Sequence, residues 1–109
     1  SAVAARMARR RREARALGLE AQRDLHDELR RRCRDAARAL REDPDYPRLR
    51  EGLTEHAMAV LGGDATVEES PDGGVVATAG SRRLDLSLPA LADREVDRLG
   101  AEVMRLWAA

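Results

Sequence analysis

The side chains that most often perform chemistry are few in this sequence. The only imidazoles belong to His26 and His56, and the only thiol belongs to Cys33. Neither histidine stands in an HExxH or Cys/His pattern, so the spacing of metal ligands is missing and we expect no metal site. A single cysteine excludes an intramolecular disulfide. Its isolation is typical of a protein from the reducing cytoplasm.

Patterns for nucleophilic catalysis and nucleotide binding are missing as well. Ser70, Ser81 and Ser87 have no GxSxG context. All twenty basic residues are arginine, so the chain lacks the lysine of a phosphate-binding loop and of a Schiff base. We therefore expect neither an enzyme nor a bound cofactor.

A dense arginine cluster near the start is the strongest chemical signal. It consists of Arg6, Arg9, Arg10, Arg11, Arg12 and Arg15. A basic helix of this density could neutralise nucleic-acid phosphates. Against that function, Glu13 interrupts the cluster, no aromatic residue lies within it, and the net charge of the chain is zero. We favour pairing with an acidic partner helix or with N-terminal sequence missing from this fragment, and an arginine-rich nucleic-acid-binding protein is the alternative.

The element that carries this cluster is predicted to be one long helix. From Val3 to Glu42 the sequence has no proline and a single glycine, and it is rich in Ala, Arg, Leu and Glu, which are strong helix formers. Charged residues make up 37% of the chain, which favours solvated helix faces over a large core. We predict a stalk helix over residues 1–42.

Apolar and small residues recur along this helix at intervals of eleven. Met7, Gly18, Leu29 and Leu40 form one series, and Val3, Ala14, Leu25 and Ala36 form a second. Three turns per eleven residues favours a right-handed coiled coil, and an ordinary amphipathic helix is the alternative. The predicted seam for a partner helix comprises Met7, Ala14, Gly18, Ala21, Leu25, Leu29, Ala36 and Leu40.

After the stalk helix the sequence predicts a small cap over residues 43–109. Two prolines in Asp43–Pro47 end the first helix, and a second helix follows with Asp45 as its N-cap and ends at Leu61, before Gly62-Gly63. Turn residues then separate three extended runs, which predict an antiparallel meander of Ala65–Ser70, Gly74–Ala79 and Arg83–Leu88.

A closing helix is predicted over Leu91–Trp107, after Pro89 ends the third strand. Leu84, Leu86 and Leu88 alternate with polar residues, so they share one sheet face, which the closing helix is expected to cover. The fold class is therefore α+β: a stalk helix and a three-stranded sheet packed by two helices. The predicted cap core comprises Leu53, Val60, Leu84, Leu86, Leu88, Val96, Leu99, Val103 and Leu106.

This order of elements resembles the peripheral-stalk E subunits of the archaeal and vacuolar-type (A/V-type) ATPases, and the most specific stretch is GGVVATAGSRRLDLSLPALADREVDRLGAEVMRLW, Gly73 to Trp107. The resemblance implies a peripheral-stalk protein, or stator, which supports proton transport without catalysing it. It implies two partners: a helical second stalk protein, of the G or H kind, and the catalytic head, on which the cap docks. A stator of a related export ATPase is an alternative.

The resemblance also bears on where the protein acts. No apolar run approaches the roughly 18 residues that a membrane-spanning helix needs. We expect a cytoplasmic protein at the periphery of a membrane-bound complex, touching the membrane only indirectly. The start at Ser1 instead of methionine is typical of a fragment, and self-association of that fragment is a further expectation.

Overall fold

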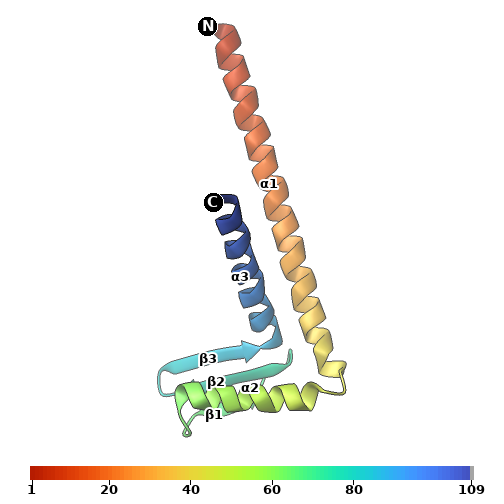
Figure 1. The fold of residues 1–109 in the computed structure, drawn as a ribbon, viewed down its shortest axis with the longest axis vertical. Coiled ribbons are helices and arrows are strands. Elements are labelled where there is room, and N and C mark those ends of the chain that lie inside the picture. Colours follow the sequence, from red (N-terminus) through yellow and green to blue (C-terminus); the bar gives the residue numbers. More distant parts are fainter. Residues whose placement is uncertain (109) are drawn as a thin grey trace.

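The fold consists of a long helix, two shorter helices and one small sheet (Figure 1). This computed structural model describes the backbone of residues 1–108 and the side chains of residues 1–106. The chain order is α1 (Ala2–Ala39), a 3-10 turn (Leu40–Glu42), α2 (Tyr46–Leu61), β1 (Thr66–Glu69), β2 (Gly74–Ala79), β3 (Arg82–Ser87) and α3 (Leu88–Ala108). The predicted α+β class is confirmed.

Helix α1 is a single unbroken helix because nothing in its sequence interrupts the backbone hydrogen bonds. Ser1 caps its start by accepting a hydrogen bond from the amide of Ala4 at 3.2 Å. None of its residues is fully buried, so helix propensity and local ion pairs such as Arg32 with Glu28 support much of its length. The molecule is correspondingly elongated, at 70 × 31 × 26 Å.

The sheet is an antiparallel meander in the order β1-β2-β3. Val75 in the central strand pairs with Glu69 on one side and with Leu86 on the other. Helix α2 lies across this sheet (Figure 1). Ala57 of α2 is completely buried against Val75, Ala77 and Leu86, because its methyl side chain lets the helix approach the strands closely.

Helix α3 differs from the prediction in both its start and its position. It begins at Leu88 instead of Leu91, since Pro89 fits the first turn of a helix and the Ser87 hydroxyl accepts a hydrogen bond from the amide of Ala90. Helix α2 packs on the leucine face of the sheet through Leu53, Ala57 and Leu61, and α3 contributes Leu91 from its start. Helix α3 then runs antiparallel beside the second half of α1 (Figure 1).

This arrangement corrects part of the predicted cap core. Leu86, Leu88 and Val96 are buried, and Leu53 and Leu84 pack partly buried against the core. Val60, Leu99, Val103 and Leu106 are 45–76% exposed. Val60 lies on the solvent side of α2, and the other three lie on the part of α3 that runs beside α1. The core is therefore smaller than predicted.

Candidate partner-binding surface

The predicted seam lies along one side of α1 and is open to solvent. Its large side chains are about half exposed or more: Met7 52%, Leu25 72%, Leu29 49% and Leu40 43%. The small seam residues Ala14, Gly18 and Ala21 are exposed as well, and Ala36 is exposed near the end of the helix. Val3 extends this apolar surface toward the start of the helix and is 57% exposed. No segment of the described chain covers the seam.

Two pairs of side chains fasten α3 to the second half of α1. The Arg34 guanidinium donates two hydrogen bonds to the Asp93 carboxylate, at 2.6 and 2.8 Å. Arg30 forms ion pairs with Asp97 and, at 3.4 Å, with Asp93. The hydrogen bonds from Arg34 lower the pKa of Asp93, and Arg30 acts in the same direction. The two helices are therefore held in register by charge as well as by packing.

An apolar groove lies between these two helices, next to the seam. Its volume is about 580 Å³, and it is lined by Gln22, His26 and Leu29 of α1 and by Val96, Leu99, Gly100, Val103 and Met104 of α3. Leu29 belongs to both the groove and the seam. Exposed Leu25, Leu99 and Val103 lie along the same region, so a helix lying on the seam can contact α1 and α3 together.

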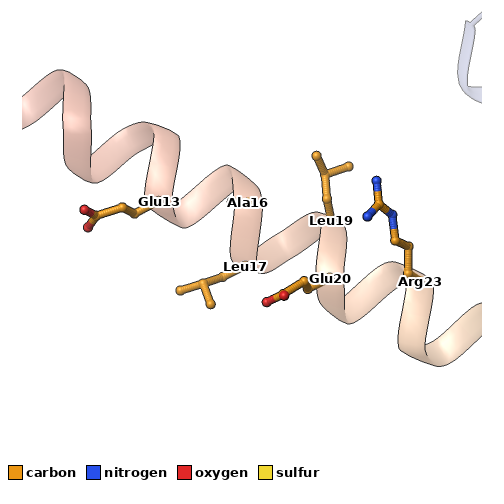
Figure 2. Close-up of a pocket in the computed structure, with 6 residues that line it drawn as sticks. All are labelled: Glu13, Ala16, Leu17, Leu19, Glu20 and Arg23. Atoms are coloured by element: carbon orange, nitrogen blue, oxygen red, sulfur yellow. The ribbon is translucent and has the colours of Figure 1, made fainter.

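A hollow on the first half of α1 is not a ligand site. Figure 2 shows that its six lining residues, Glu13, Ala16, Leu17, Leu19, Glu20 and Arg23, all belong to this one helix. Glu13, Leu17 and Glu20 point to one side of α1, whereas Leu19 and Arg23 point to another (Figure 2). Nothing in the described chain forms a second wall. The feature is the ordinary surface between side chains of a solvated helix.

The residues most capable of chemistry are not brought together. Within the described residues, no group of three or more histidine, cysteine, aspartate or glutamate side chains could hold a metal ion. His26 lies 3.1 Å from the guanidinium of Arg30, which also pairs with Asp97. Cys33 is partly buried on α1 as a free thiol. These positions therefore form no shared site.

A polar cluster at the base of the cap joins α2 to the hairpin of β1 and β2. The Tyr46 hydroxyl accepts a hydrogen bond from the amide of Gly74 at 3.0 Å and donates one to Glu69 at 2.9 Å. Arg50 pairs with Glu69 at 3.0 Å, and its guanidinium lies 5.8 Å from the centre of the Tyr46 ring. Burial raises the pKa of Tyr46, and Arg50 lowers the pKa of Glu69.

The sequence did not predict either the α1–α3 ion pairs or the Tyr46 cluster. The signal for the first was present: Arg30 and Arg34 are four residues apart, as are Asp93 and Asp97, so each pair occupies one face of its helix. The Tyr46 cluster had no comparable signal, because its members meet only when the sheet folds against α2.

Comparison of the chain with protein-family models, with curated proteins and with solved structures finds no match. Among the described helices, none has a stretch apolar and long enough to cross a lipid bilayer.

Proposed function

We propose that this chain is a peripheral-stalk component of a rotary ATPase of the archaeal and vacuolar type. In this proposal it acts without catalysing a reaction, in the cytoplasm, at the edge of a membrane-bound complex. The seam binds the helix of a second stalk protein, and the cap docks on the catalytic head. The choice of family in this proposal rests on the resemblance of residues 73–107 to the E subunits of these motors.

The observation that carries the proposal is the exposed seam on a helix that is fixed to the cap. A stator must transmit torque between a long helix and a head-binding domain, so the joint between them has to resist bending. The pairs of Arg34 with Asp93 and of Arg30 with Asp97 brace α1 against α3, and α3 continues directly from β3. The seam, meanwhile, remains open to a second helix.

A pulldown with the full-length protein tests the function, with Leu29→Asp as the diagnostic variant. Wild type is expected to recover subunits of a rotary motor. Leu29→Asp places a carboxylate in the middle of the seam, where its burial without a partner is costly, and partner affinity is expected to fall at least tenfold. The midpoint of cap unfolding is expected to stay nearly unchanged, since Leu29 is half exposed and lies outside the cap core.

Leu19→Asp is the matched control, because Leu19 is similarly exposed, at 54%, but lies on α1 outside the seam. It is expected to bind partners like wild type. Recovery of nucleic acid instead of motor subunits, lost when Arg9 to Arg12 are replaced by serine, would support the alternative function and refute the stator. Equal binding by wild type and Leu29→Asp would show that the seam is not the partner surface.

A further inference from the structure

The first part of α1 carries the opposite charge from the stretch that follows it. Residues 3–15 contain six arginines and one glutamate, whereas residues 17–29 contain four acids and one arginine. All the charged side chains of residues 3–15 are exposed. Two such helices side by side in parallel would place like charges together, while an antiparallel pair would place each basic stretch beside an acidic one.

The spacing of the apolar residues fits the antiparallel arrangement. When a second copy of the helix is reversed and its Leu29 is placed opposite Val3, Leu25 falls opposite Met7 and Gly18 falls opposite Ala14. In this one register the six positions therefore form three facing pairs between the two copies. Large side chains meet large ones toward both ends. Small ones meet near the middle, where even a Cβ added at Gly18 would have no neighbour within 4 Å in this chain.

The charged residues beside the seam are complementary in the same register. Arg6, Arg10, Glu20, Asp24 and Glu28 follow one another at helical spacing along one side of α1. In the reversed copy, Arg6 lies between Asp24 and Glu28, and Arg10 lies between Glu20 and Asp24. Among the ion pairs of the described residues, none involves Glu20 or Asp24, so both are available to a second molecule.

We infer that, in the absence of another partner, two copies of this chain pair antiparallel through residues 3–29 of α1. The start of each α1 then lies along the seam of the other copy, at the edge of the groove formed by Leu29, Leu99 and Val103. The two caps lie at opposite ends of the dimer. The pairing rests on charge and spacing in this chain and is independent of the rotary-motor assignment, but it uses the surface that the proposed stalk partner would take.

Disulfide trapping tests the register in the full chain, with Cys33→Ser as the background so that each protein has one thiol. Met7→Cys protein is mixed with Leu25→Cys protein under mild oxidation. The expected product is the mixed disulfide, because the two positions face each other, whereas the Met7 positions of the two copies lie about 27 Å apart at 1.5 Å per residue. Ala16→Cys is the matched control: it lies at the centre of the same register but faces away from the seam, so it is expected to remain reduced.

Charge reversal gives an independent readout by analytical ultracentrifugation. The wild type is expected to sediment as a dimer. Arg6→Glu with Arg10→Glu is expected to raise the dimer dissociation constant at least tenfold, and adding Glu20→Arg and Asp24→Arg to the same chain is expected to restore dimerisation. Self-linking of Met7→Cys in preference to the mixed disulfide would overturn the inference in favour of a parallel pair. A monomer that forms no mixed disulfide would overturn it in favour of a seam reserved for a different protein.

Discussion

Arg34 and Asp93 make the best-defined contact between α1 and α3. Asp93 accepts two hydrogen bonds from one guanidinium, a geometry that arginine forms and lysine cannot. Because Arg34 lowers the pKa of Asp93, this carboxylate stabilises the folded state fully above its pKa in the unfolded chain, which is about 3.9. The contribution is lost as the pH falls through the lower pKa of the folded state.

Asp93→Asn is therefore expected to lower the melting temperature by a few degrees at pH 7, because it removes one bidentate ion pair that is partly exposed. Thermal unfolding followed by circular dichroism measures the effect. The difference from wild type is expected to shrink as the pH falls below about 4. Asp35→Asn is the control, because Asp35 pairs with Arg38 inside α1, and it is expected to change the melting temperature less. Equal effects of the two variants at pH 7 would mean that the contact between the helices adds no more stability than an ion pair within α1.

Gly74 is a position where neighbouring backbone leaves no room for a side chain. Its φ is +76°, and a Cβ at this position would lie 2.3 Å from the carbonyl oxygen of Leu86. Gly80 also has a positive φ, of +62°, but open space surrounds it. Replacing each glycine by alanine therefore distinguishes the energetic cost of backbone strain from the cost of a steric collision.

Gly74→Ala is expected to lower the free energy of unfolding by at least about 3 kcal/mol, because the added methyl group meets backbone that cannot move aside. Gly80→Ala is expected to cost only about 1 kcal/mol, which is the strain of the left-handed conformation alone. Urea denaturation measures the free energy of unfolding of the two variants. A similar loss for both variants would contradict the close approach of Gly74 to β3.

At the scale of elements, α1 consists of a free half and a braced half. The first part of α1 extends beyond the end of α3 (Figure 1), and no ion pair among the described residues connects residues 2–21 to another element. Farther along, Arg30, Arg34 and Arg38 reach α3 or the turn at Asp72. A long helix without tertiary contacts is held only by its own hydrogen bonds and propensity.

Hydrogen exchange at low protein concentration is expected to separate the two halves. Amides of residues 6–20 are expected to exchange at least tenfold faster than those of residues 30–38, because the free half can open locally without disturbing the cap. Mass spectrometry of peptic peptides resolves the two segments. Uniform protection along α1 in dilute solution would contradict the division into a free and a braced half.

Sequence patterns predicted these elements well but predicted their packing only in part. The single long helix, the break at Pro44 and Pro47, and the three strands follow from strong local signals: helix propensity, proline and turn residues. The amphipathic pattern of α3 did not predict its position. Such a pattern indicates that one face of the helix is buried, but it does not indicate which element packs against that face. In the structure, the small side chain of Ala57 lets α2 pack closely on the sheet face, which α3 contacts through Leu91.

The same reasoning explains the exposed residues of the predicted core. Leu99, Val103 and Leu106 follow the helical spacing of a buried stripe, but the part of α3 that carries them lies beside α1 instead of over the sheet. Leu99 and Val103 line the groove that also contains Leu29 of the seam, whereas Leu106 is exposed outside that groove. These residues, predicted to lie in the core, are therefore exposed apolar surface in this chain.

For the molecule as a whole, the stator proposal joins a long seam-bearing helix to a small cap in which the described residues form no metal-binding cluster. In that proposal the long helix carries the surface for a second stalk protein and the cap carries the surface for the head, and a helix on the seam would bury apolar side chains that are exposed in this chain. The proposal therefore depends on what occupies the seam in the cell.

Site-specific photocrosslinking in the organism that makes the full-length protein measures that occupancy most directly. A benzophenone amino acid replaces Leu25 in the seam, and the same substitution at Leu19 serves as the control. The account predicts that the Leu25 position crosslinks to a helical component of a rotary motor and that the Leu19 position does so much less. Crosslinks from Leu25 only to nucleic acid, to a second copy of this chain or to proteins unrelated to a rotary motor would contradict it.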